Sequence, residues 1–318
     1  MHSRESTLSP PSALQALETA LGAAIRGKKE VIRLSIVCLL ARGHLLIEDV
    51  PGVGKTTLAH GLARAIDCRF QRIQFTSDML PSDVLGVTIY NAHSESFEFK
   101  PGPVFTNILL ADEINRTTPK TQSALLECMN EDQVTIDGRS LPLPDPFLVV
   151  ATQNPSEHHG AYPLPESQLD RFLLRLRIGY PDSASEREIL RNHLKGSDAV
   201  PAVCSGEEIV VLQKQAQQVR SDESILDYIL AIVERTRSHE GLVLGVSPRG
   251  SQALFRAAQA HALMNGRDYL LPDDVKRLVV PVFGHRVIVQ PRSALGGRRA
   301  EAGDRILEEI LTQVEVPL

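Results

Sequence analysis

The sequence predicts a three-layer α/β domain built on a parallel sheet, followed by a smaller domain made of helices. Short apolar runs at 45–47, 108–111 and 147–151 are typical of strands buried on both faces, as parallel strands are. Segments with helical periodicity lie between these runs, and such alternation favours a sheet covered by helices on both sides. After residue 181 the chain shows little strand pattern, so the remainder is expected to be helical.

The elements of the first domain follow from local patterns. Apolar residues at helical spacing predict helices over 14–25 and 29–41, ahead of the strand at 45–47. Helices at 57–66 and 119–130 and strands at 69–74, 108–111, 147–152 and 172–178 complete the layers. Alternating residues between 87 and 105 predict an inserted hairpin, with a plain surface loop as the alternative. Asp137-Gly138 between extended flanks predicts a second hairpin.

The second domain is expected to contain helices at 185–193, 207–219, 223–238, 248–265 and 303–314. The fourth is well delimited, because Ser247 suits an N-cap, Pro248 a first turn and Gly266 the position after the end. We therefore expect a flexible tail over 1–12, the α/β domain over 13–181 and the helical domain over 182–318.

Composition limits the classes of function. The chain has 318 residues, 42% of them hydrophobic, with a net charge of −5 and a pI near 6.1. This charge disfavours a dedicated nucleic-acid binder, which relies on a basic surface. No signal-peptide pattern occurs in 1–12, and charged residues interrupt the apolar stretch at 31–50. We therefore expect no membrane insertion. The chain has four widely spaced cysteines, which indicate a reducing, cytoplasmic location; they are Cys38, Cys68, Cys128 and Cys204.

The segment from Asp49 to Thr57 carries the strongest chemical signal. It lies between a strand and a helix, where backbone N–H groups and the helix N-terminus attract phosphate groups. Lys55 is expected to reach the β- and γ-phosphates of a nucleotide, and the Thr56 hydroxyl to bind Mg²⁺. Asp49 stands where this motif usually begins with glycine, so we expect its carboxylate to point away from the phosphates. The expected nucleotide-binding residues are Pro51, Gly52, Val53, Gly54, Lys55, Thr56 and Thr57.

Asp112 and Glu113 follow the second apolar run, which ends at the same sheet edge as the phosphate loop. Asp112 is expected to hold Mg²⁺ through its water shell. Glu113 is expected to polarise the attacking water, because hydrolysis needs a positioned nucleophile. Alone, this pair would fit a solvated strand end; after a phosphate loop it indicates an ATPase.

Three further residues are candidates for catalysis. Asn154 follows the next buried strand, where a neutral amide can bond the γ-phosphate and the water, although a simple turn is the alternative. Arg171 precedes the last strand and suits either a surface ion pair or a finger donated into a neighbour's site. Arg249 lies in the first turn of a capped helix, where its charge and the helix dipole both attract an anion. His158-His159 lack the spacing of a metal site, and we expect none there.

The order of these features resembles that of the motifs in AAA+ ATPases. The phosphate loop corresponds to Walker A and Asp112-Glu113 to Walker B. Asn154 corresponds to sensor 1, Arg171 to the arginine finger and Arg249 to sensor 2. The finer similarity is to the MoxR family. It covers nearly everything from Gly27 to Val316 and is carried by segments 46–56, 111–116, 164–172, 247–249, 266–269 and 285–286.

The resemblance implies a three-layer AAA+ P-loop NTPase core with a parallel sheet and two inserted hairpins, followed by an all-α lid domain. It also implies a homo-hexameric ring that uses ATP and Mg²⁺ to remodel or mature a protein client. Metal-cofactor insertion and a von Willebrand factor A domain partner are typical of the family. Arg116 is a second candidate for the finger. Tyr90 and Phe97 could contact a client, although core packing is the favoured interpretation.

Four alternatives stay open at this stage. A chelatase-type motor subunit and a nucleic-acid-translocating AAA+ ring share the motifs, although no basic stripe is visible. A small-molecule kinase or GTPase would leave Arg171, Arg249 and the helical domain unexplained. A scaffold that binds ATP without hydrolysing it would leave Glu113 without a purpose.

Overall fold

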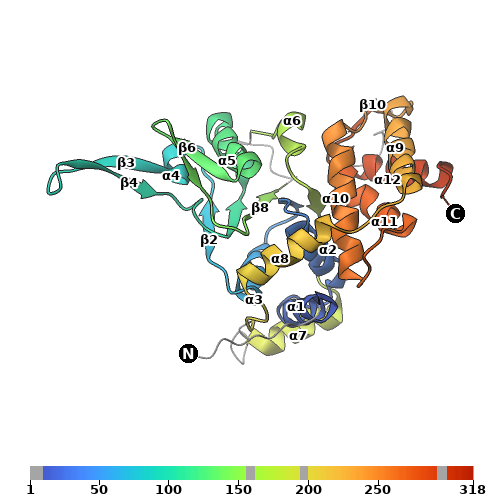
Figure 1. The fold of residues 1–318 in the computed structure, drawn as a ribbon, viewed down its shortest axis with the longest axis horizontal. Coiled ribbons are helices and arrows are strands. Elements are labelled where there is room, and N and C mark those ends of the chain that lie inside the picture. The colour runs from blue at the N-terminus through green and yellow to red at the C-terminus, as the bar shows by residue number, and fades with distance from the viewer. Residues whose placement is uncertain (1–9, 155–161, 194–199, 292–298, 318) are drawn as a thin grey trace.

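A five-stranded parallel sheet forms the centre of the first half of the chain (Figure 1). The computed structural model describes residues 10–154, 162–193, 200–291 and 299–317. The strand order is β2-β5-β8-β1-β9, so the two strands that follow each other in sequence, β1 and β2, lie far apart in the sheet. The strands are β1 (Leu45–Glu48), β2 (Phe70–Gln74), β5 (Ile108–Asp112), β8 (Leu148–Gln153) and β9 (Leu174–Leu176).

Alternate residues of the three central strands, β5, β8 and β1, enter two separate apolar cores. On β1, Leu45 and Ile47 join the core that contains the N-terminal helices, whereas Leu46 joins the core under α5. Both faces are therefore covered, as the three-layer prediction requires. The covering helices are α1 (Pro10–Ala24), α2 (Lys29–Leu40) and α3 (Lys55–Ala65) for the first core, and α4 (Pro81–Leu85) and α5 (Pro119–Glu131) for the second.

Both predicted hairpins are confirmed. The first, β3 (Gly86–Asn91) with β4 (Ser96–Pro101), projects from the body of the molecule (Figure 1). The second pairs β6 (Gln133–Ile136) with β7 (Arg139–Pro142). Core packing of Tyr90 and Phe97 was the wrong expectation: they stack edge-to-face on the first hairpin and are 56% and 75% exposed. The reason is that this hairpin extends beyond the layers that would cover it.

The helical part contains one helix that local pattern did not predict. It is α11, Pro272–Phe283, and its pattern is masked because Pro281 in its last turn resembles a helix stop. Two short strands, β10 (Leu242–Leu244) and β11 (Ile288–Val289), pair with each other, and they contact α9 and α12, respectively. The other helices of this part are α7 (Ser183–His193), α8 (Gly206–Gln217), α9 (Glu223–Ser238), α10 (Pro248–Met264) and α12 (Arg299–Gln313), whereas the short helix α6 (Glu166–Leu169) precedes β9 in the α/β part. No helix among the described residues is both long and apolar enough for a bilayer.

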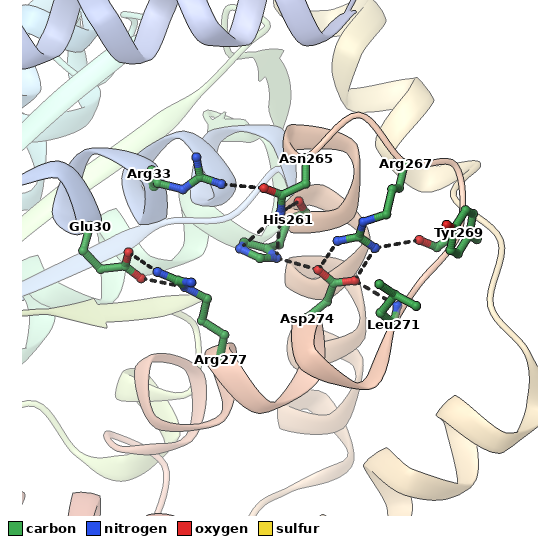
Figure 2. Close-up of polar contacts among 9 residues, drawn as sticks. All are labelled: Glu30, Arg33, His261, Asn265, Arg267, Tyr269, Leu271, Asp274 and Arg277. Carbon is green, nitrogen blue, oxygen red and sulfur yellow. Dashed lines mark hydrogen bonds and ion pairs between the residues drawn. The ribbon is translucent and has the colours of Figure 1, made fainter. Parts of the chain in front are cut away.

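The helical part packs directly on α2. One apolar core runs from α1, α2 and α3 into α8, α10 and α11 without interruption. Polar contacts close its rim, as Figure 2 shows. Arg277 of α11 bonds Glu30 of α2 through two nitrogens, the shorter contact at 2.6 Å, and Arg33 donates to Asn265 at 2.8 Å.

Asp274 is the most heavily bonded carboxylate at this rim (Figure 2). It is 1% exposed and accepts hydrogen bonds from Arg267 at 2.6 and 2.7 Å, from His261 at 2.7 Å and from the Leu271 amide at 2.9 Å. Burial opposes its ionisation, but the bonds from His261, Arg267 and Leu271 outweigh burial and lower the pKa of Asp274 to about 2.

We expect Asp274→Asn to lower the free energy of unfolding by about 3 kcal/mol at neutral pH, because the partly buried Arg267 loses its buried counter-charge. A carboxylate with a lowered pKa stabilises the fold above its unfolded pKa and loses that contribution as the pH falls through its folded pKa. The difference between wild type and Asp274→Asn should therefore shrink between about pH 4 and pH 2. Urea denaturation at several pH values measures it.

Asp273→Asn is the matched control, because Asp273 is the exposed neighbouring carboxylate in the same helical turn. It should cost less than about 1 kcal/mol. Equal losses for the two variants, or a difference that does not change with pH, would contradict the assigned role of Asp274.

Candidate active site

The loop between β1 and α3 has a backbone that only glycine adopts easily at two positions. Gly52 and Gly54 have φ values of 83° and 95°, and no atom lies within 4 Å of where their Cβ atoms would be. Conformation rather than crowding therefore requires glycine here. Gly54 caps α3, which begins at Lys55, so the first amides of the helix are turned toward the loop. The Lys55 ammonium donates to the Asp49 carbonyl at 2.7 Å.

Asp49, the departure from the usual phosphate-loop motif, has a structural partner. Its carboxylate accepts hydrogen bonds from the amide of Gly179 at 2.6 Å and from that of Val50 at 2.9 Å. Gly179 follows β9, the strand next to β1. The Asp49 side chain thus fastens the start of the loop to the neighbouring strand end, and both carboxylate oxygens are engaged there.

The carboxylates at the end of β5 are held by a threonine of the adjacent strand. The Thr152 hydroxyl donates to Asp112 Oδ1 at 2.6 Å and accepts from the Glu113 amide at 2.9 Å. Arg72 of β2 binds the other oxygen, Asp112 Oδ2, at 2.7 Å. One buried hydroxyl therefore orients both acidic residues. Local sequence did not reveal Thr152, because only the sheet places it beside β5.

Glu113 is held in an unusual conformation. Its φ of 57° lies in the left-handed region, which costs energy for a residue other than glycine and is frequent at functional sites. Its Oε2 accepts hydrogen bonds from Gln74 Nε2 at 2.8 Å and from Arg116 Nε at 2.9 Å. Arg116, the second finger candidate, thus pairs with Glu113 of its own chain. Gln74 was also not predicted, and its position at the end of β2 is the signal that could have found it.

Asn154 comes directly after β8, between β5 and β1 in the sheet, and is 6% exposed. The amide of Asp49 bonds the carbonyl of Gln153 at 3.2 Å, so this strand end adjoins the phosphate loop. The carboxyl edge of the sheet thereby gathers the phosphate loop, Asp112, Glu113 and Asn154. Carboxylate and hydroxyl oxygens suit Mg²⁺, so Asp112 and Thr56 fit the expected metal. No cluster of three His, Cys, Asp or Glu occurs within the described ranges, and His158-His159 lie outside them.

Arg171 and Arg249 lie elsewhere. They line one cavity of about 920 Å³ together with Gly43, His44 and Leu173, the residues that precede β1 and β9. Because the strands are parallel, this is the amino edge of the sheet, opposite the phosphate loop. Arg171 Nη1 donates to the Leu126 carbonyl at 2.7 Å. Neither arginine belongs to the group of residues around Lys55 in the same subunit.

The cavity carries an excess of positive charge. Five of its lining side chains are arginines and two are carboxylates, and the ion pairs formed among them are Arg42 with Asp132 and Arg286 with Asp170. Burial lowers the pKa of His44 to about 4, so this histidine adds no charge. Across the described part of the chain, three of these arginines have no carboxylate partner: Arg171, Arg249 and Arg256.

Arg256 was not predicted as a site residue. It lies seven residues after Arg249 on α10, which places both on one face of the helix, and this spacing is the signal that could have identified it. Burial and the charge of Arg249 lower the pKa of Arg256. A set of unneutralised guanidinium groups that repel one another is suited to a multiply charged anion.

Known proteins resemble this chain closely. It matches the ATPase family associated with various cellular activities (AAA) over residues 44–174 and the AAA lid domain over residues 234–310. It is 52% identical to the protein YeaC of Bacillus subtilis (strain 168), over 92% of this chain and 91% of that protein. It is 43% identical to Chaperone MoxR1 of Mycobacterium tuberculosis, over 83% and 73%, and 30% identical to Protein MoxR of Paracoccus denitrificans, over 94% and 95%.

A solved structure agrees with the fold. The crystal structure of a protein described as a candidate ATPase, from Cytophaga hutchinsonii ATCC 33406, matches with a TM-score of 0.89 and 38% sequence identity. The match covers 97% of this chain and 96% of the other. The predicted fold class, a parallel α/β core followed by a helical lid, is confirmed.

The Thr152 hydroxyl gives a first test of the site. We expect Thr152→Val to slow ATP turnover by about 10- to 100-fold, because hydrogen bonds to charged groups are worth about 1.5–3 kcal/mol. Nucleotide affinity should change by less than about threefold, since the phosphate loop keeps its own bonds. Steady-state turnover and equilibrium binding measure the two quantities.

Thr121→Val is the matched control. It removes a threonine hydroxyl that is equally buried but donates to the Met79 carbonyl, outside the carboxylate group. Turnover should be retained in this variant. A similar loss in both variants would mean that Thr152 contributes only to stability.

Proposed function

Because the chain belongs to the MoxR family of AAA+ ATPases, we propose that it hydrolyses Mg·ATP to ADP and phosphate in order to remodel or mature a protein client. The observation that carries the proposal is the group at the carboxyl edge of the sheet. There, the proposed phosphate loop adjoins the partly buried carboxylate of Asp112, the carboxylate of Glu113 fixed by two donors, and the buried amide of Asn154.

The residues take distinct roles in this proposal. The amides from Gly52 to Thr57 and the Lys55 ammonium bind the β- and γ-phosphates. Thr56 and Asp112 hold Mg²⁺, which would neutralise phosphate charge when bound. Glu113 accepts a proton from the attacking water, and Asn154 orients that water against the γ-phosphate.

The arginines would act on a neighbouring subunit. Arg171 and Arg249 lie at the sheet edge opposite the phosphate loop, so a head-to-tail contact brings the positive edge of one copy to the phosphates of the next. Such heterologous contacts close into rings when the rotation permits, and we propose a homo-hexamer. The pairing of Arg116 with Glu113 favours Arg171 as the finger.

The client and partner are proposed from the family and the surface. The Mycobacterium tuberculosis relative is named a chaperone, and the exposed pair Tyr90 and Phe97 on a projecting hairpin is suited to contact with a protein. A von Willebrand factor A domain partner, metal-cofactor insertion and a cytoplasmic location belong to the same proposal. A chelatase-type motor is the alternative with the same site chemistry.

Two variants separate binding from hydrolysis. Lys55→Ala should abolish ATP binding, because the loop loses the cation that faces the phosphates. Glu113→Gln should bind ATP normally but release no phosphate, because the amide cannot accept the proton. Calorimetric titration with ATP and a phosphate-release assay measure these effects. Unchanged affinity in Lys55→Ala would refute the assignment of the loop.

Arg171→Ala tests the site formed between subunits. Turnover should fall by roughly 10³–10⁵, the range for arginine fingers, while ATP binding stays near normal. Mixing Arg171→Ala with Glu113→Gln subunits should restore part of the activity, because each supplies what the other lacks. No restoration in mixed rings, shown to be mixed by differently tagged subunits, would contradict the trans arrangement.

A further inference from the structure

The carboxylate of Asp170 lies between the two segments that carry the arginines. Asp170 immediately precedes Arg171, and its Oδ2 accepts a hydrogen bond from the Ser247 hydroxyl at 2.9 Å. Ser247 is the N-cap of α10, two residues before Arg249. The same hydroxyl accepts from the Gly250 amide at 3.2 Å, so it is fixed on both sides. One carboxylate thus joins residues 170–173, the finger segment that carries Arg171, to the first turn of α10.

Arg286 holds the rest of this segment. Its Nε donates to Asp170 Oδ1 at 2.7 Å, and its Nη2 donates to the carbonyls of Asp170 at 3.2 Å and Phe172 at 2.6 Å. Nη1 also reaches the Leu173 carbonyl at 3.2 Å. The Arg286 side chain is 2% exposed. Burial lowers the pKa of Arg286 to about 10, against the opposing effect of Asp170, so the group stays charged at neutral pH.

These bonds connect elements that are otherwise far apart in the chain. Arg171 is 78 residues from Arg249. Asp170 nevertheless bonds Ser247, the N-cap of the helix that carries Arg249, and it also bonds Arg286, which holds residues 170–173 in place. Two guanidinium groups on independently moving segments would each have to be ordered when they meet a phosphate. Holding both segments in one arrangement removes that entropic cost before binding.

We infer that Asp170 is a positioning residue, which fixes the spacing of Arg171 and Arg249 so that both guanidinium groups meet the triphosphate of a neighbouring subunit together. This inference rests on the proposed trans arrangement. Asp170 itself touches no phosphate, because both of its oxygens are occupied by Ser247 and Arg286.

The variant Asp170→Asn tests the inference. It keeps the size of the side chain but removes the charge that binds Arg286, and we expect kcat to fall by about 10- to 100-fold. Affinity for ATP should change by less than about threefold, because the subunit's own phosphate loop lies at the opposite edge of the sheet. Ser247→Gly breaks the same link from the lid side while keeping a residue that tolerates the N-cap position, and it should lower kcat in the same way.

Asp304→Asn is the matched control. Asp304 of α12 joins the lid to Arg175 of β9, and its side chain is 20% exposed, as is that of Asp170. It makes no contact with the finger segment among the described residues. If both links serve only to hold the lid in place, the two variants will lose activity equally; if the inference holds, Asp304→Asn keeps kcat.

Mixed rings separate positioning from damage to the subunit. Glu113→Gln subunits carry intact arginines, so mixing them with Asp170→Asn subunits should give more turnover than the two variants give alone. The pair Arg171→Ala with Glu113→Gln is the reference for the trans arrangement. Recovery in the reference pair with none in the Asp170→Asn pair, or a normal kcat for Asp170→Asn alone, overturns the inference and leaves the proposed function intact. No recovery in the reference pair overturns both.

Discussion

A parallel sheet has a direction, and this direction separates the charged groups of the molecule into two sets. Loops that follow β1, β5 and β8 carry the amides of the proposed phosphate loop, the carboxylates and Asn154, whereas segments that precede β1 and β9 border the arginine cavity. Groups at opposite edges of a sheet cannot meet within one subunit. In the proposed ring, assembly is therefore a condition for a complete site, and the polarity of the strands makes it so.

Strand register also supplies the precision of the site. Asp112 and Glu113 are oriented by Thr152 from one neighbouring strand and by Arg72 and Gln74 from the other. Thr152 belongs to β8, which is buried on both faces, whereas Arg72 and Gln74 belong to the edge strand β2, whose Ile73 packs in the core under α5. The acidic groups are thus held by the same forces that stabilise the fold, which is how a site can be preorganised before its ligand arrives.

The sequence allowed most of the fold to be predicted, because apolar runs, Asp137-Gly138 and helix caps are local signals. It failed for α11, where Pro281 hides a helix, and for Tyr90, whose burial depends on how far a hairpin extends. The MoxR resemblance is confirmed. Contiguous motifs identified the candidate site residues. Their partners Thr152 and Gln74 become neighbours of the carboxylates only through strand pairing, and the location of Arg249 depends on how the helical part packs. None of that is written in a local pattern.

The uninterrupted apolar core between α2 and α10 has a mechanical meaning. Moving the helical lid away from the sheet would expose a large apolar surface to water, so each subunit is expected to behave as a rigid body. In the proposed ring, displacement generated by ATP cleavage would then have to occur at the interfaces between subunits, where the nucleotide would lie. Conformational change in such a ring would occur at the interfaces between subunits, while the fold within each subunit would stay unchanged.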